Sequence, residues 1–374
     1  MTSPTIPTSE LIELFLRLAG IEGTSLAERK VTDEVALILR NEGIQVLEDD
    51  AAGSLGGNSG NLLCFPPDYD PSRSAKMLTA HLDTVRSTGQ LKPVIEAGAI
   101  RSDGSTILGG DNRLGLTVLV QVLIQIARQR VSHGNFFVVF TVGEETGLYG
   151  AGAVDLSPYQ TACAYVFDCS KRPGVYIREA VGLRMFNAQF IGKAAHSGVA
   201  PEEGVSAIQL ASAAISRLQL GRIDAETTAN IGKISGGEAI NAIPEKVNIE
   251  GEVRSFSLDR MNQQLRLIEE TLISSVGSKG KVAFVAQPDF EPYVLSPQAP
   301  MIMDLDRAML SVGLTPHPIR YTGGSDANKY NAKGIPAVNI GIGAQKPHSH
   351  EEFVLIEDMV KSYELAYELA RQAH

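Results

Sequence analysis

Two histidines and several carboxylates stand at or near the ends of short apolar runs, where their side chains could act together. They are His81, Asp111, Glu144, Glu145, Asp168 and His348. A single Asp in such a place usually caps a turn. A whole set at predicted strand exits instead favours one shared site, because open α/β sheets bind ligands at the carboxyl ends of their strands.

The types of these residues point to metal ions. Imidazole nitrogens and carboxylate oxygens are the usual ligands of catalytic zinc, and mixed sites of this kind also take manganese or cobalt. The carboxylates of Asp111, Glu144, Glu145 and Asp168 would balance the charge of two divalent cations. Without cations, the four would repel one another and raise each other's pKa values. The pattern therefore predicts a metal-dependent hydrolytic site.

Buried strands and one long helix must position these side chains. The runs Asn61–Phe65, Met77–Ala80, Phe136–Val142 and Ala162–Phe167 are short and bounded by turn residues. Such runs are typical of buried strands. A helix over about 112–130 lies between two of them. This alternation predicts an α/β layered core.

Two helices precede that core. The first is expected from Ser9 to Gly20, because Leu11, Phe15 and Leu18 share one face. The second is expected from Ser25, where Glu28 three residues later completes a capping-box pattern, and it should stop at Gly43.

The pattern changes between residues 183 and 292, which predicts an inserted α+β domain. Strands are expected over 185–191, 228–234, 246–254 and 282–286, with helices over 204–218 and 259–275. This β-α-β-β-α-β order is that of a ferredoxin-like domain. Beyond Pro292 the α/β character returns, with a helix over 301–312, a strand over 337–340 and a closing helix over 355–371. The first domain would thus comprise residues 1–182 and 293–374.

Composition excludes several other classes of protein. The chain has 374 residues, a net charge of −10 and no basic stripe, which argues against nucleic acid as a partner. No apolar run reaches the roughly 20 residues needed to cross a bilayer. Met1–Glu10 lacks the pattern of a secretory signal. The three cysteines have no metal-site spacing, so we expect buried thiols and a cytoplasmic protein.

Taken together, the motifs of the chain resemble those of the M20 metallopeptidase family, and most closely its peptidase T branch. Any one motif is weakly specific, but the set occurs in family order from about His81 to Val354. The matching segments are Ala80-His81-Leu82-Asp83-Thr84-Val85, Gly109-Gly110-Asp111-Asn112-Arg113-Leu114-Gly115, Gly143-Glu144-Glu145-Thr146-Gly147, Phe167-Asp168, Gly192-Lys193-Ala194-Ala195-His196-Ser197-Gly198, and His348 with Glu352-Phe353-Val354.

The resemblance implies a zinc-exopeptidase-like catalytic domain, in which helices flank a mixed sheet, with an inserted lid or dimerisation domain. It also implies a role for each ligand. Asp111 would bridge two metal ions. One ion would also be held by His81 and Asp168, and the other by Glu145 and His348. The ions would be zinc, with cobalt or manganese as alternatives.

Two further carboxylates would assist these ligands. Asp83, two residues past His81, would orient its imidazole, which sets the tautomer and raises the basicity of the ring; the alternative is an Asp that caps a turn. Glu144 would be the general base that activates a water bound to the metals and passes its proton to the leaving amine.

Three residues of the inserted domain also match the family. His196 would stabilise the oxyanion, often from the partner subunit of a homodimer. Asn241 resembles an Asn that contacts substrate, and Arg254 resembles an Arg that holds a substrate carboxylate. The alternatives are a surface His, a turn Asn and an exposed strand Arg.

Some details of the match stay open. Arg113 stands where many members carry Lys, and His350 competes with His348, which has the family spacing to Glu352. Gly324-Ser325-Asp326 lacks the last glycine of a nucleophile elbow, and we interpret the loop 322–326 as a substrate-side loop or a helix cap.

The expected activity is hydrolysis of short peptides by an aminopeptidase, a di- or tripeptidase. The same site could instead serve an N-acyl-amino-acid amidohydrolase or a carboxypeptidase, with Arg254 holding the substrate carboxylate. A non-catalytic homologue that binds peptides is the third alternative, and the intact Glu144 argues against it.

Overall fold

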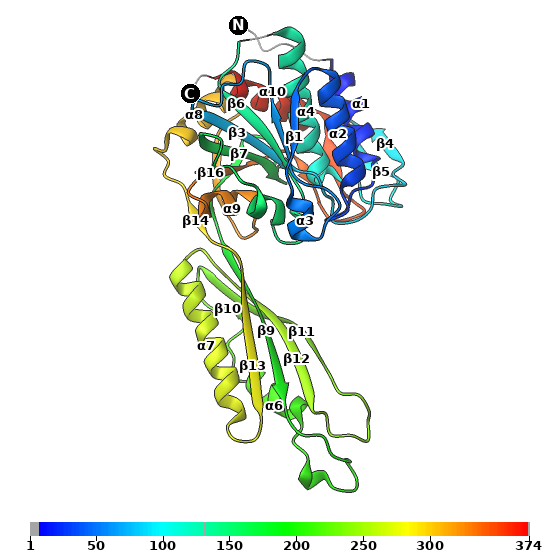
Figure 1. Ribbon diagram of the computed structural model, residues 1–374, viewed down its shortest axis with the longest axis vertical. Helices are drawn as coiled ribbons and strands as arrows, with labels where there is room; N and C mark the ends of the chain where they lie inside the picture. The colour runs from blue at the N-terminus through cyan, green and yellow to red at the C-terminus, as the bar shows by residue number, and fades with distance from the viewer. Residues whose placement is uncertain (1–6, 131, 373–374) are drawn as a thin grey trace. The chain divides into compact units, whose positions relative to one another are not determined.

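A computed structural model describes residues 7–130 and 132–372, apart from the side chain of Pro288, and Met1–Ile6 lie outside this range. The chain divides into two compact units (Figure 1). The first comprises Met1–Arg178, Val294–Arg320 and Ser325–His374, and the second Glu179–Tyr293 and Tyr321–Gly324. Each unit is described by itself below.

A nine-stranded mixed sheet forms the centre of the first unit among the described residues. Its strands follow the order β1-β2-β6-β3-β7-β16-β8-β14, with β15 beside β8. Strands β6, β3, β7 and β16 run parallel, so their carboxyl ends share one edge of the sheet. The strand bounds are β1 Gln45–Glu48, β2 Leu62–Phe65, β3 Ala75–His81, β6 Phe136–Thr141, β7 Thr161–Cys169, β8 Val175–Ala180, β14 Tyr293–Val294, β15 His317–Tyr321 and β16 Ala337–Gly341.

Helices pack against this sheet in two groups. The long α4 (Gly110–Gln129) contacts β3 and β7 and packs with α1 (Thr8–Ala19), α2 (Arg29–Asn41) and α10 (Ile356–Arg371). The short α9 (Asp326–Ala332) contacts β7 and β16 and packs with α5 (Tyr149–Ala153). The other described helices of this unit are α3 (Ala51–Leu55) and α8 (Pro300–Ser311). A small sheet of β4 (Pro93–Glu96), β5 (Ala99–Ser102), β17 (Ala344–Gln345) and β18 (Phe353–Leu355) completes the unit.

The predicted fold class is therefore confirmed. Every residue of β3 and β6 is buried, as expected of strands that are covered on both faces. The three cysteines are free and buried, as expected, and burial raises the pKa of the Cys163 thiol to about 11 and that of Cys169 to about 12.

The predicted start of the second helix is wrong. Helix α2 begins at Arg29, not near Ser25, and its N-cap residue is Glu28, whose side chain forms no capping hydrogen bond; the backbone N–H of Arg29 donates to Asn58 Oδ1 instead. The Ser25 hydroxyl donates instead to Asp83 Oδ2, 2.6 Å away. The buried Glu28 accepts hydrogen bonds from the backbone N–H groups of Leu26 and Gly143. Long-range contacts thus use both residues of the supposed capping box.

The second unit has the predicted ferredoxin-like order. Strands β9 (Gly182–Ile191), β11 (Thr227–Gly236), β12 (Lys246–Ser255) and β13 (Lys281–Phe290) form an antiparallel sheet with the short β10 (Gly221–Arg222). The strand order is β10-β11-β12-β9-β13. Helices α6 (Ala207–Ile215) and α7 (Leu258–Val276) pack on the sheet, and their apolar residues share its core with Phe186, Val247 and Val253. The described helices include none with the length and apolar character needed to span a bilayer.

Candidate metal centre

Four of the six candidate residues stand on or just after the parallel strands β3, β6 and β7. His81 is the last residue of β3, and Asp168 is the next-to-last residue of β7, so both lie inside strands rather than beyond them. Glu144 and Glu145 follow the end of β6 at Thr141. Asp111 lies in the first turn of α4, where its backbone is not helical.

Asp111 lies between two groups of side chains. Its Oδ1 is 3.2 Å from His81 Nε2, which is also 3.2 Å from Asp168 Oδ1. Its Oδ2 is 3.5 Å from His348 Nε2, which is 2.9 Å from Glu145 Oε1. Each oxygen of one carboxylate thus faces one His–carboxylate pair.

The donor set fits divalent cations. Ligand atoms of His81, Asp111 and Glu145 all lie within 4.8 Å of one another, close enough for these residues to bind metal ions together. Asp168 extends this group through its contact with His81, and His348 extends it through its contacts with Asp111 and Glu145. Imidazole nitrogens and carboxylate oxygens are suited to zinc, cobalt or manganese. The two-sided surroundings of Asp111 provide separate donors for two ions.

The protonation of the site responds to this crowding of negative charge. Burial opposes protonation of His81, but hydrogen bonds to Asp111, Asp168 and Asp83 outweigh it and raise its pKa. Hydrogen bonds to Asp111 and Glu145 raise the pKa of His348 to about 10. Burial, with neighbouring carboxylates, raises the pKa values of Glu145 and Asp168. Positive charge, from protons or cations, therefore stabilises the arrangement.

Glu144 stands apart from the two His–carboxylate pairs. Its Oε2 is 3.9 Å from His81 Nε2, and 10% of its side chain is exposed. Burial and the nearby Asp168 raise its pKa well above the ordinary value, and Asp326 adds to this effect. A glutamate carboxylate in such a position can accept a proton and return it, as a general base does.

Asp83 contacts both the His81 ring and the turn that carries Glu144 and Glu145. Its Oδ1 lies 3.2 Å from His81 Nδ1, on the ring edge opposite Asp111. Its two oxygens also accept hydrogen bonds from the backbone N–H groups of Glu144 and Glu145, each 3.1 Å long. The buried carboxylate thus holds the turn that carries both glutamates, and the backbone carbonyl of Asp83 also lies 3.0 Å from His81 Nδ1.

Glu352 holds the backbone around Asp111 as Asp83 holds that of Glu144 and Glu145. The sequence placed it only within a matching motif and gave it no role. Its Oε2 accepts from Gly109 N (2.8 Å) and its Oε1 from Asp111 N (2.9 Å). A Cβ on Gly110 would lie 3.1 Å from Glu352 Oε1 and 3.0 Å from Val354. The buried Glu352 carboxylate therefore holds the turn that carries Asp111, and Gly110 packs closely against it because it has no side chain.

Replacing this carboxylate should weaken metal binding without removing a proposed ligand. In Glu352→Gln, the amide NH₂ must face one of the two backbone N–H donors. We expect a loss of about 10–100-fold in metal affinity and of about 1–3 kcal/mol in the free energy of unfolding. Metal titration by calorimetry and denaturant unfolding measure the two effects. Glu351→Gln is the control, because this neighbour is exposed and pairs with Lys346; equal affinities in the two variants would contradict the assignment.

Arg113 and the C-terminal loop complete the first unit's site. The buried Arg113 guanidinium donates to Leu82 O and to Ile21 O (3.1 Å), so it supports the segment that follows His81.

His348 has a left-handed backbone (φ 62°), an arrangement that costs energy in a non-glycine residue. His350 Nδ1 lies 2.7 Å from Gly104 O instead. The loop 322–326 includes the N-cap of α9, where Ser325 and Asn328 form a capping box.

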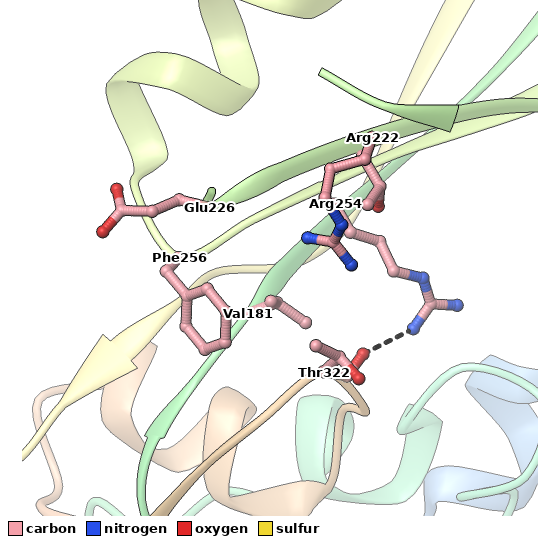
Figure 2. Close-up of a pocket in the computed structure, with 7 residues that line it drawn as sticks. Val181, Arg222, Glu226, Arg254, Phe256 and Thr322 are labelled. Carbon is pink, nitrogen blue, oxygen red and sulfur yellow. Dashed lines mark hydrogen bonds between the residues drawn. The ribbon is translucent and has the colours of Figure 1, made fainter. Parts of the chain in front are cut away.

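The other three predicted site residues belong to the second unit. His196 and Asn241 lie on neighbouring loops, joined by a bridge between His196 and Ala242 and by a hydrogen bond from Ser197 N to Asn241 O (3.0 Å). Both residues are exposed. Arg254 (Figure 2) lies on β12, where it is half-buried, and it forms an ion pair with Glu252.

Comparison with known proteins gives matches along the whole chain. A model of the peptidase dimerisation domain matches residues 178–277, and a model of the M42 glutamyl aminopeptidases matches residues 94–174. An uncharacterized protein of Bacillus subtilis, YqjE, is 33% identical over 97% of this chain and 98% of its own. Peptidase T of Bacillus pumilus is 25% identical over 73% of this chain and 67% of its own.

Two solved structures are similar over 98% of this chain and 98% of their own. The aminopeptidase PepT from Bacillus cereus superposes with a TM-score of 0.88 at 32% identity. A tripeptidase from Staphylococcus aureus superposes with a TM-score of 0.90 at 32% identity.

Proposed function

Because the chain belongs to the M20 family of metallopeptidases, in its peptidase T-like branch, we propose that it removes the N-terminal residue from tripeptides and other short peptides. The chain is a hydrolase that depends on divalent metal ions. The observation that carries the proposal is the position of Asp111 between two His–carboxylate pairs.

The proposed ligands follow that geometry. Asp111 would bridge two ions, one held also by His81 and Asp168 and the other by Glu145 and His348. We propose zinc as the native metal, with cobalt or manganese as substitutes, because imidazole and carboxylate donors suit all three. When bound, such ions polarise the scissile carbonyl and lower the pKa of water.

Glu144 moves the protons of the reaction. Its carboxylate accepts a proton from the attacking water and returns it to the leaving amine. Asp83 holds the backbone of Glu144 and the ring of His81 in fixed positions, so the base and the metal ligand keep their relative geometry.

Residues of the inserted domain complete the proposed machinery. We place the functional boundary at residues 183–292 and assign this domain the role of lid and dimerisation surface. His196 stabilises the oxyanion, Asn241 contacts the substrate, and Arg254 holds a substrate carboxylate. Exposed apolar residues of this domain, Val199, Ile234 and Ile240, support a homodimer; sedimentation equilibrium tests it, and a monomer at assay concentration would contradict it.

A peptide panel tests the activity. Metal-loaded protein should release the N-terminal residue of tripeptides and should not cleave the same peptides when their N-terminus is acetylated. Cleavage of blocked peptides would favour the N-acyl-amino-acid amidohydrolase or carboxypeptidase alternative. No turnover with zinc, cobalt or manganese, in protein shown by elemental analysis to bind two ions, would refute the proposal.

We also propose that the protein works in the cytoplasm. Its three cysteines are free and buried, as is usual in a reducing compartment. Cell fractionation tests this assignment, and recovery outside the cytoplasmic fraction would contradict it.

A further inference from the structure

The loop of residues 23–28, between α1 and α2, contacts the segment that follows β3. Thr84 N donates to Gly23 O at 3.0 Å, and the Ser25 hydroxyl donates to Asp83 Oδ2 at 2.6 Å. Asp83 is the carboxylate that accepts from two N–H groups of the turn after β6. The Ser25 hydroxyl therefore holds a group that itself holds the backbone of the proposed base.

The side chain of Glu28 reaches the turn after β6 directly. Its Oε1 accepts two hydrogen bonds, from Leu26 N at 2.8 Å and from Gly143 N at 2.9 Å. Gly143 immediately precedes Glu144 and has a left-handed backbone (φ 61°), which glycine adopts at little cost. Glu28 is fully buried, and its Oε2 has no hydrogen-bond partner within the described residues. A single oxygen, Oε1, thus accepts both of the hydrogen bonds to this side chain.

Three successive N–H groups of this turn therefore donate to buried carboxylates. Gly143 N donates to Glu28, and the N–H groups of Glu144 and Glu145 donate to Asp83. Successive backbone donors of this kind form concave sites for anions, and here two side chains of the protein itself occupy the site. Asp83 holds the peptide groups on both sides of the Glu144 Cα, and Glu28 extends this hold to the residue before it.

The two carboxylates share one buried cation. Burial, with the nearby Asp83, raises the pKa of Glu28. Burial lowers the pKa of Arg113 to about 10, while Asp83 and Glu28 oppose this change and favour the charged guanidinium. Buried charges add little to stability even when they are compensated. Stability alone therefore does not account for two carboxylates at one turn.

We propose that Glu28 is a positioning residue for Glu144, and that Ser25 assists it by holding Asp83. The proposal rests on the proposed function, in which Glu144 moves the protons of the reaction. Because glycine has many allowed conformations, Gly143 needs the Oε1 acceptor to remain in one of them. A displacement of about 1 Å in a catalytic site can lower the rate by about 100-fold, so loss of this acceptor should slow the chemical step.

The test compares Glu28→Met with Glu28→Gln in metal-saturated protein. Methionine has a similar length but offers no acceptor to Gly143 N, so kcat for a tripeptide should fall about 10–100-fold, while KM should stay within about twofold. Glutamine retains one side-chain oxygen, which can accept both hydrogen bonds. Glu28→Gln should therefore keep at least about a third of the wild-type kcat. Elemental analysis confirms that the compared proteins contain equal amounts of metal.

Hydrogen exchange reports on the turn without any turnover. In Glu28→Met, the Gly143 amide should exchange about tenfold faster than in the wild-type protein, and in Glu28→Gln it should exchange at close to the wild-type rate. Mass spectrometry of a peptide that covers residues 142–146 measures this exchange.

The matched control is Thr32→Val, which removes a buried hydroxyl from the same helix, α2. This hydroxyl donates to Glu28 O and to Ser59 Oγ, both at 3.1 Å, and does not contact the turn after β6. Thr32→Val should lower the midpoint of unfolding and change neither kcat nor the exchange of Gly143. It therefore separates a general loss of stability from a loss of position.

Lower kcat and faster exchange in Glu28→Met, with both restored in Glu28→Gln, support the proposal. Wild-type kcat in Glu28→Met would overturn it, as would an equal loss of kcat in Glu28→Gln or in Thr32→Val. If Glu28→Met does not fold, Ser25→Ala replaces it; this variant should lower kcat by about tenfold, and an unchanged kcat would contradict the proposal. If the wild-type protein hydrolyses no peptide, the proposed function fails, and the exchange of Gly143 still decides whether Glu28 holds the turn.

Discussion

Glu144→Gln should lower kcat by about 10²–10⁴-fold, the range usual for loss of a general base, while the protein still binds its metal ions. The glutamine has nearly the same shape but cannot accept a proton. Glu144 belongs to neither of the pairs that face Asp111, and its Oε2 is 3.9 Å from His81 Nε2. Peptide turnover under saturating substrate measures kcat, and elemental analysis measures the metal content.

Two comparisons make this result specific. Glu13→Gln changes an exposed glutamate of α1 and should alter neither quantity. Glu145→Gln changes a proposed ligand and should lower the metal content as well as kcat. If Glu144→Gln lost its metal ions to the same extent as Glu145→Gln, the separation between base and ligand would be wrong.

Asp111→Asn should weaken the binding of both metal ions together, by more than about 100-fold, since even residues behind a ligand contribute 10–100-fold. The substitution removes a negative charge that faces both His81 and His348. His348→Ala should instead weaken mainly one ion, because this ring faces Asp111 and Glu145 on one side of the site. Calorimetric titration of zinc into chelator-treated protein gives the stoichiometry and affinities.

The control for this pair is Asp33→Asn, an exposed helix residue paired with Arg29, which should bind two ions with unchanged affinity. The bridging assignment fails if Asp111→Asn keeps one ion at wild-type affinity while His348→Ala loses both.

The sequence was sufficient to predict the layered fold and the strands that lead to the site. Runs such as Phe136–Thr141 are buried at every position, and the alternation of Val247, Ile249 and Val253 follows the buried face of β12. Both signals are local, because burial in a sheet leaves a pattern within one segment. The ferredoxin-like order followed from the sequence of these segments.

Contacts between distant segments could not be predicted in this way. Ser25 and Glu28 form a good local capping pattern, but Ser25 donates to Asp83 and Glu28 accepts from Gly143 N. Glu352 stands 241 residues from Asp111, whose backbone it holds. Short strands such as β10 were not predicted, because two residues are too few to show a hydrophobic pattern. The register that aligns Arg222 with Arg254 depends on β10, so it could not be predicted either.

The buried carboxylates that hold the turns of the metal centre have a consequence for the order of assembly. Asp83 fixes the turn of Glu144 and Glu145, and Glu352 fixes the turn of Asp111, through protein hydrogen bonds alone. The conformational entropy of ordering these turns is therefore lost when the chain folds and not when the ions arrive. Metal loading and folding become separate events, unlike in small domains that unfold without their metal. A chelator should therefore remove the ions from a protein that stays folded and can bind metal ions again.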